Sequence, residues 1–271
     1  MKAHLFQLDP VWEDREANFK LVEQATATAD ISPGDLLVLP ELFDSGFSLN
    51  VTRTADKDGG TLRFLLELAD DLGVTIQGSR TVLACQCSQA TNRATVVGPN
   101  DRLICDYSKI HPFTLGREPE AFLGGARVET YAWGNATVCP AICYDLRFPE
   151  LFRLGLAAGA EVFAIGANWP AARHEHWRAL AVARAIENQA FVLAVNRVGT
   201  DPHLEYLGGT LAIDSMGRTL GELGDDPGVL SVEIDTGSVR AWRSEFPAWR
   251  DMKLMPGAGS TPGGSPHAGE A

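Results

Sequence analysis

The sequence predicts an α/β fold in which helices cover stacked β-sheets, and two features of its 271 residues indicate this class. Apolar runs of strand length recur along the chain, and several are apolar at successive positions, as in strands buried on both faces. Stretches with apolar residues at helical spacing lie between these runs. Strand and helix alternate in the first and middle parts, and strands dominate from about residue 190 to 235, which is typical of a layered α/β sandwich.

The strand segments are clearest in LLVLP, VFAIGA and FVLAV, where nearly every position is apolar. A strand with one face in water would alternate apolar and polar positions, so we expect these three in the interior of a sheet. The expected strands span residues 4–8, 36–40, 74–77, 95–97, 137–142, 162–167, 191–195, 209–213 and 229–234.

Four segments show the apolar periodicity of helices. The most regular has leucines or alanine at 62, 65, 66, 68, 69 and 72 and stops at Gly73, because glycine is a common residue just after a helix. The last is the longest, and its Trp177 is expected to contact the core. The expected helices span residues 13–29, 61–72, 148–158 and 173–189.

The chain divides into one folded region and a tail. From Pro256 onward it reads PGAGSTPGGSPHAGEA, which has no apolar periodicity and too little apolar surface to form a core. We expect residues 256–271 to be disordered. No comparable linker interrupts residues 1–250, so we predict a single domain there.

Charge and composition exclude several classes of partner. The net charge is −12, which disfavours nucleic acid and anionic membranes, because both select clustered Lys and Arg. No apolar run is long enough to cross a membrane, and the N-terminus lacks the apolar core of a signal peptide. Five cysteines, an odd number, indicate reduced thiols. We expect a cytoplasmic protein without a disulfide framework.

Glu41 is the first candidate for chemistry. It follows the buried segment LLVLP directly, and carboxylates rarely lie next to a core strand unless they are paired. Glu41 either ends the strand in solvent or lies at the carboxyl end of a strand, where α/β folds build their sites. In the second case it is a candidate general base.

Lys109 lies in YSKIHPF, between a predicted strand end and a loop. A lone lysine is commonly a solvated surface charge, but a fixed lysine cation stabilises a developing oxyanion. His111 in the same stretch is a rival, because a histidine next to a cysteine activates the thiol.

Cys143 ends the strand-like run TVCPAIC and precedes the predicted helix 148–158. A free cysteine is more often a small buried hydrophobe than a nucleophile. At a strand-to-helix turn, however, helix N–H groups would favour a thiolate and form part of an oxyanion hole.

Taken together, PELF, YSKIHPF and ICYDLRFPELFR, in this order, resemble the nitrilase superfamily of carbon–nitrogen hydrolases. The resemblance continues through GANWPAARHEHW, ARAIENQAFVLAVNRVGTD and GGTLAIDSMGRTLGELG, and so covers about residues 3–235. It implies a four-layer α-β-β-α sandwich, which agrees with the pattern of elements. It also implies an amidase that needs neither a metal nor an organic cofactor.

The resemblance also assigns roles. Cys143 is similar to the nucleophile, Glu41 to the general base and Lys109 to the oxyanion-stabilising cation, with the backbone N–H of Tyr144 as second oxyanion donor. Members often carry a second glutamate between the Lys and the Cys. GREPEAFLGG offers Glu118 and Glu120, and we choose Glu120 for its spacing to Gly125.

Within the superfamily, NWPAARHEHW and ARAIENQAFVLAVNRVG are most similar to the ω-amidase branch. Its members cleave the terminal amide of short ω-amide carboxylates such as 2-oxoglutaramate and 2-oxosuccinamate. Such a substrate needs a group for its carboxylate, and arginine binds carboxylates with two parallel hydrogen bonds. Arg147 and Arg173 are the candidates, although Arg147 could instead pair with Asp145 or Glu150. Aromatic walls are expected from Phe43 and Trp169.

Alternatives within the superfamily are an N-carbamoyl amino acid amidohydrolase, a deaminated-glutathione amidase and a nitrilase. Pro112 and Thr114 differ from the residues that many ω-amidases have in this loop, so the reaction class is better supported than the substrate. A member that has lost its triad would only bind, but Glu41, Lys109 and Cys143 are all present. The resemblance also implies a homodimer.

Overall fold

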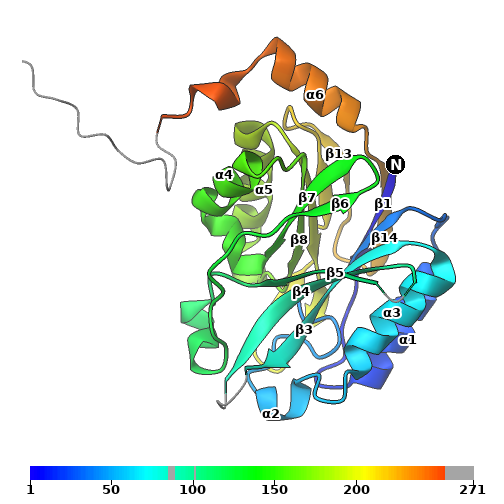
Figure 1. The fold of residues 1–271 in the computed structure, drawn as a ribbon. Coiled ribbons are helices and arrows are strands. Elements are labelled where there is room, and N and C mark those ends of the chain that lie inside the picture. The colour runs from blue at the N-terminus through cyan, green and yellow to red at the C-terminus, as the bar shows by residue number, and fades with distance from the viewer. Residues whose placement is uncertain (85–88, 101, 254–271) are drawn as a thin grey trace, which may run out of the picture.

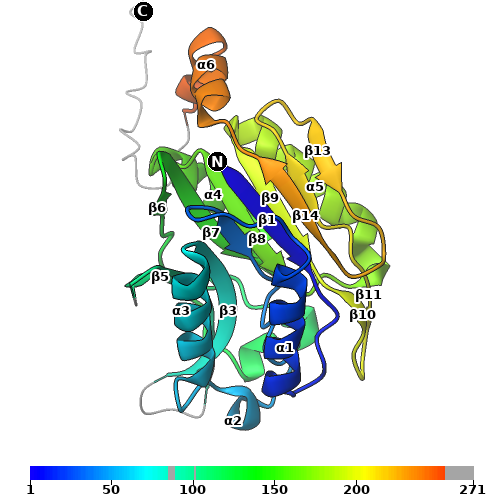
Figure 2. The same ribbon diagram turned by 90° about the vertical axis from the view of Figure 1, so that its right-hand side faces the viewer.

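Two six-stranded sheets face each other in the computed structural model, which describes residues 1–84, 89–100 and 102–253. Long helices lie outside each of the two sheets, so the layers follow the order α-β-β-α (Figure 1). Seen after a 90° turn, α1 and α3 run side by side over the same sheet (Figure 2). The predicted four-layer sandwich is confirmed. The outer helices are α1 (Arg15–Thr26), α3 (Gly60–Leu72), α4 (Pro149–Ala157) and α5 (His174–Asn188).

The first sheet has the strand order β14-β1-β2-β3-β4-β5. Its central strands β1, β2 and β3 are parallel, and the remaining pairs are antiparallel. The strands are β1 (Lys2–Gln7), β2 (Leu36–Val38), β3 (Thr75–Leu83), β4 (Ala90–Gly98), β5 (Arg102–Ser108) and β14 (Gly228–Glu233).

The second sheet has the order β13-β12-β9-β8-β7-β6, and its central strands β7, β8 and β9 are again parallel. The strands are β6 (Tyr131–Trp133), β7 (Ala136–Ile142), β8 (Val162–Ala167), β9 (Phe191–Asn196), β12 (Leu211–Ile213) and β13 (Thr219–Glu222). A separate two-stranded ribbon pairs β10 (Val198–Thr200) with β11 (Glu205–Leu207).

The continuous apolar runs arise because each central strand contributes to two cores. In β1, Leu5 belongs to the core between the sheets, whereas Phe6 belongs to the core under α1 and α3. Val38 and Leu37 of β2 divide in the same way. Successive side chains of a strand point to opposite faces, so both positions must be apolar when both faces are covered.

The helix boundaries follow local signals in the sequence. Asp14 caps α1 by accepting a hydrogen bond from the Ala17 N–H at 3.1 Å, and Pro149 occupies the first turn of α4. Gly73 ends α3 with φ of 67°, in the left-handed region that glycine adopts without strain. Two helices were not predicted, α2 (Val51–Thr54) and α6 (Thr236–Glu245).

The predicted disordered tail, residues 256–271, lies outside the described residues. In the part of the chain that the structure describes, no helix has both the length and the apolar character required to span a membrane.

Candidate active site

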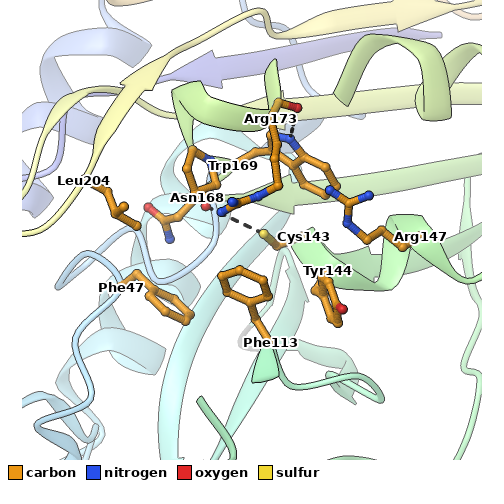
Figure 3. A pocket seen from close by; sticks show the side chains of 10 residues that line it. Phe47, Phe113, Cys143, Tyr144, Arg147, Asn168, Trp169, Arg173 and Leu204 are labelled. Carbon is orange, nitrogen blue, oxygen red and sulfur yellow. Dashed lines mark hydrogen bonds between the residues drawn. The ribbon is translucent and has the colours of Figure 1, made fainter. Parts of the chain in front are cut away.

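Three predicted site residues meet where strands of the two sheets end. Glu41 follows β2, Lys109 follows β5 directly, and Cys143 is the first residue after β7. The carboxyl ends of parallel strands lie at one edge of a sheet, and here the equivalent edges of two facing sheets meet. Cys143 lies at a pocket whose lining also includes Phe47 and Arg173, which are far from it in sequence (Figure 3).

Lys109 lies between two buried carboxylates. Its ammonium Nζ donates to Glu41 Oε1 at 2.7 Å and to Glu118 Oε2 at 2.8 Å. Its side chain is 1% exposed, and those of both glutamates are 0% exposed. Burial alone would lower the pKa of Lys109, but the charges of Glu118 and Glu41 outweigh burial and raise it above its ordinary value. Lys109 therefore remains a cation inside the protein.

The structure corrects the choice of second glutamate from Glu120 to Glu118. Glu118 points inward to Lys109, whereas the Glu120 side chain is 58% exposed and pairs with Arg117 at 2.6 Å. Both residues belong to one short 3-10 helix, η2 (Glu118–Glu120), and side chains two apart on such a helix point in different directions. Only one of them can face the site.

Asn92 joins the two carboxylates. Its Nδ2 donates to Glu41 Oε1 at 2.8 Å and to Glu118 Oε1 at 3.2 Å. Its own Oδ1 accepts from the Ser79 hydroxyl at 3.0 Å, which fixes the orientation of the amide. Sequence reasoning missed Asn92, because it is a polar residue within an ordinary mixed strand.

Asn168 holds the other side of Glu41. Its backbone N–H donates to Glu41 Oε2 at 3.0 Å, and its Nδ2 donates to the Glu41 backbone carbonyl at 2.6 Å. The Asn168 carbonyl is in turn 3.7 Å from Cys143 Sγ. Asn168 follows the buried strand β8 in the same way that Glu41 follows β2, a signal by which the sequence could have identified it.

The Cys143 thiol is buried, with the residue only 7% exposed. Burial and the negative charge of Glu41 raise its pKa well above the ordinary value, against the opposing charge of Lys109. The turn at Cys143 is a short 3-10 helix, η3 (Cys143–Arg147), so the helix N-terminus expected to favour a thiolate does not begin at the cysteine. The charge of Glu41 also opposes a thiolate there.

The backbone around Cys143 adopts an uncommon conformation. Its φ is 45°, and Leu42, next to Glu41, also has φ of 45°. Non-glycine residues with positive φ cluster at functional sites, where the surrounding structure supports the strain. The Tyr144 N–H lies in the first turn of η3, where the first amides lack carbonyl partners within the helix.

His111 does not act as the partner of Cys143. Its Nδ1 lies 2.8 Å from Asp145 Oδ1, and its ring stacks on Phe148 with the centroids 3.7 Å apart. Within the described ranges, no hydrogen bond joins His111 to Cys143. The histidine belongs to a network around Asp145 instead.

The pocket walls match four of the five predicted binding residues. Tyr144, Arg147, Trp169 and Arg173 all line the pocket, but Phe43 does not. Phe43 is fully buried in the core under α1 and α3, where its ring packs against Phe19 and Phe64. Phe47, not Phe43, lines the pocket. The complete lining is Phe47, Phe113, Cys143, Tyr144, Arg147, Asn168, Trp169, Pro170, Arg173 and Leu204.

Two arginines in this wall have no acidic partner in the described part of the chain. The Arg147 guanidinium lies over the Trp169 ring at 4.7 Å and hydrogen bonds to His176 Nδ1 at 3.2 Å, not to Asp145 or Glu150. The Arg173 guanidinium lies over the Phe113 ring at 5.3 Å. Burial lowers the pKa of Arg147, and the charge of Arg173 adds to the effect. An anionic ligand would relieve this excess of positive charge.

Comparison with known proteins defines the class. The model of the carbon–nitrogen hydrolase family matches residues 2–244, and the chain therefore belongs to this family. It is an enzyme that hydrolyses carbon–nitrogen bonds, as the nitrilase-superfamily resemblance predicted.

Individual relatives cover most of the chain. A 2-oxoglutaramate amidase from Bacillus subtilis is 36% identical over 81% of this chain and 85% of its own length. An ω-amidase from Yersinia enterocolitica is 34% identical over 93% of this chain and 96% of its own. Among solved structures, a carbon–nitrogen hydrolase superfamily protein from Xanthomonas campestris superposes with a TM-score of 0.88. It is 32% identical, covers 94% of this chain and 98% of its own, and carries an arsenic adduct in its active site.

Proposed function

We propose that this protein is an ω-amidase, which hydrolyses the terminal amide of a short ω-amide carboxylate of the 2-oxoglutaramate or 2-oxosuccinamate type. The observation that carries the proposal is a pocket lined by Cys143 and by two arginines that have no acidic partner among the described residues, with the buried Glu41–Lys109–Glu118 network close to the cysteine. The names of the 2-oxoglutaramate amidase and ω-amidase relatives support the same substrate class.

In the first half of the proposed reaction, Cys143 Sγ attacks the amide carbon while Glu41 takes the thiol proton. The developing oxyanion is stabilised by the Lys109 ammonium and the Tyr144 N–H. Glu41 then gives the proton to the departing nitrogen, ammonia leaves and a thioester remains. Glu118 and Asn92 keep Lys109 and Glu41 in place during these steps.

In the second half, a water molecule takes the position that ammonia has left. Glu41 removes a proton from this water, which attacks the thioester carbon, and the same two donors stabilise the second oxyanion. Collapse of the intermediate breaks the carbon–sulfur bond and returns the proton to Cys143. The products are a carboxylate and ammonia.

The far end of the substrate distinguishes ω-amides from simple amides. Its carboxylate would meet Arg147 and Arg173, whose guanidinium groups are oriented by Trp169 and Phe113. Arginine side chains preorganised in this way bind carboxylates strongly because little side-chain entropy is lost on binding.

The direct test is a side-by-side assay of ammonia release from 2-oxoglutaramate, glutaramate, N-carbamoyl-alanine and a simple nitrile. We expect the two ω-amide carboxylates to be turned over with the highest kcat/KM and Cys143→Ala to abolish the activity. Higher kcat/KM for N-carbamoyl-alanine or for the nitrile would assign the protein to another branch of the superfamily.

Assembly and location are further parts of the proposal. We infer a homodimer from the family resemblance, and a cytoplasmic location from the odd number of cysteines, which is typical of reduced thiols. Light scattering on the purified protein tests the assembly, because a monomer mass at micromolar concentration would contradict it.

A further inference from the structure

A second and larger cavity opens beside the pocket. It has a volume of about 660 Å³, against about 20 Å³ for the space around Cys143. We call it the outer chamber. The two spaces share Phe47, Phe113, Arg173 and Leu204, so the pocket continues into the chamber. The remaining lining of the outer chamber is Trp12, Glu13, Ser48, Leu49, Asn50, Leu115, Gly116, Arg117, Asp201 and His203.

The acidic groups of the outer chamber are already engaged. Glu13 accepts from the Ser48 hydroxyl at 2.6 Å and pairs with Arg53 at 3.0 Å. Asp201 accepts from the backbone N–H of Leu204 at 2.8 Å and from the Tyr206 hydroxyl at 2.6 Å. Neither carboxylate is therefore free to select a cationic ligand.

Apolar side chains make up much of the remaining wall. Leu115 is 76% exposed and Leu204 is 38% exposed, although both border the entrance to an enzyme pocket. The half-buried Trp12 ring, held edge-on by His203 at 5.8 Å, adds a flat apolar surface. Burial of such surfaces by a ligand is favourable, and apolar walls with few polar anchors are typical of small-molecule sites.

The residues around Cys143 show on which side of a bound substrate the apolar wall of the outer chamber would lie. In Figure 3, Phe47 and Leu204 lie on one side of the cysteine, Tyr144 and Arg147 lie on the other, and Arg173 extends between them. Phe47 and Leu204 also line the outer chamber, so the chamber opens on their side of the cysteine. A substituent on an amide bound at Cys143, with its carboxylate at the arginines, would extend past Phe47 and Leu204 into the chamber.

We infer that the enzyme also accepts ω-amides that carry an apolar substituent on the carbon next to the carboxylate, with N-acyl glutamines as the representative class. The inference rests on the proposed function, because the same cysteine cleaves the same terminal amide. Cys143 attacks the carbon of the terminal amide, the terminal carbon–nitrogen bond breaks and ammonia leaves, and water then hydrolyses the thioester to the carboxylate and the free thiol. The N-acyl amide stays intact, since its carbonyl lies in the chamber and away from Cys143.

The test compares N-phenylacetyl-L-glutamine with N-acetyl-L-glutamine, using ammonia release and 2-oxoglutaramate as the reference substrate. Both acyl glutamines offer the same amide and carboxylate, and they differ only in the apolar arm. We expect kcat/KM for the phenylacetyl compound to exceed that for the acetyl compound by about 10- to 100-fold, the discrimination typical of an apolar pocket. Leu115→Asp should remove most of this preference.

Leu103→Asp is the matched control, because Leu103 is 48% exposed on β5 and borders a different surface. It should keep the wild-type preference. Equal kcat/KM for the two acyl glutamines, or the same loss of preference in both variants, would overturn the inference. If 2-oxoglutaramate is hydrolysed and neither acyl glutamine is, the inference fails while the proposed function stands. If none of the three is hydrolysed, the proposed function itself fails.

Discussion

Glu118 accepts two hydrogen bonds from Lys109, at 2.8 and 3.1 Å, and is as deeply buried as the lysine it contacts. The lysine is therefore held from two sides, by Glu41 and by Glu118. Its remaining freedom is small, and an oxyanion donor works best when it needs no reorganisation during the reaction.

The first prediction compares the two glutamates of the η2 turn. Glu118→Gln weakens the hold on Lys109 and should lower kcat by roughly 10²-fold, the low end of the range for loss of an oxyanion donor. Glu120→Gln breaks only an exposed ion pair with Arg117 and should stay within about twofold of wild type. Steady-state ammonia release measures kcat for both variants. A larger loss of kcat in Glu120→Gln than in Glu118→Gln would show that Glu120 is the second glutamate, as the sequence predicted.

The second prediction concerns the protonation of Cys143. Because burial and Glu41 raise its pKa, the thiol should be less ionised at alkaline pH than an ordinary cysteine. The difference in thiolate ultraviolet absorbance between wild type and Cys143→Ala should then be smaller than the signal of one ordinary cysteine at the same pH. The other cysteines cancel in this comparison. A thiolate signal at neutral pH that Cys143→Ala removes would contradict the proposed role of Glu41 as base.

The third prediction concerns Asp145, a buried carboxylate two residues after the proposed nucleophile Cys143. It accepts from the Ile142 N–H at 3.1 Å, from the Tyr107 hydroxyl at 2.7 Å and from the His111 N–H at 3.0 Å. Tyr107 and His111 lie on either side of Lys109 in sequence, and Ile142 precedes Cys143. Asp145 is therefore a positioning residue that sets the spacing of the lysine and the thiol.

Asp145→Asn replaces an acceptor with an amide that cannot serve all these donors, so we expect kcat to fall by roughly 10- to 100-fold with KM little changed. Tyr107→Phe removes one hydrogen bond and should cost only about 1 kcal/mol, or severalfold in kcat. Thermal unfolding accompanies both assays. An Asp145→Asn variant that is folded and has the wild-type kcat would refute the positioning role.

From the sequence it was possible to predict charged or nucleophilic residues that follow apolar strand segments. Glu41 and Cys143 each follow a buried strand, and a charged or nucleophilic side chain at such a place can be recognised from the sequence alone. The same logic predicted helix 61–72, which the structure places at Gly60–Leu72. Helix α6 was not predicted, because Val239 is its one buried apolar residue among the described positions and leaves no periodic stripe.

The misassigned residues depend on local backbone geometry that periodicity does not encode. Arg117, with φ of 59°, precedes the turn that sends Glu118 inward and Glu120 outward. Leu42, with φ of 45°, similarly precedes Phe43, which packs under the helices while Phe47 reaches the pocket. A residue with a left-handed φ changes the direction of the side chains that follow it. Neither Arg117 nor Leu42 is a residue type that predicts this conformation.

The last prediction concerns stability and pH, through Asp44 in the segment that follows Glu41. Asp44 is fully buried, its Oδ2 accepts from the Thr61 hydroxyl at 2.7 Å, and its Oδ1 has no hydrogen-bond partner among the described residues. Burial, the largest effect, raises the pKa of Asp44 to about 6, and the nearby charge of Asp56 acts in the same direction.

Because the folded state holds this proton more tightly than the unfolded state, the contribution of Asp44 to stability is fully present below about pH 4. It is lost as the pH rises through about 6. Asp44→Asn keeps an acceptor for Thr61 but cannot ionise. The variant should therefore be more stable than wild type at pH 8, by an amount on the order of 3 kcal/mol, and close to wild type at pH 4. Chemical unfolding at the two pH values measures this difference, and an equal effect of the substitution at both would show that Asp44 does not titrate between them.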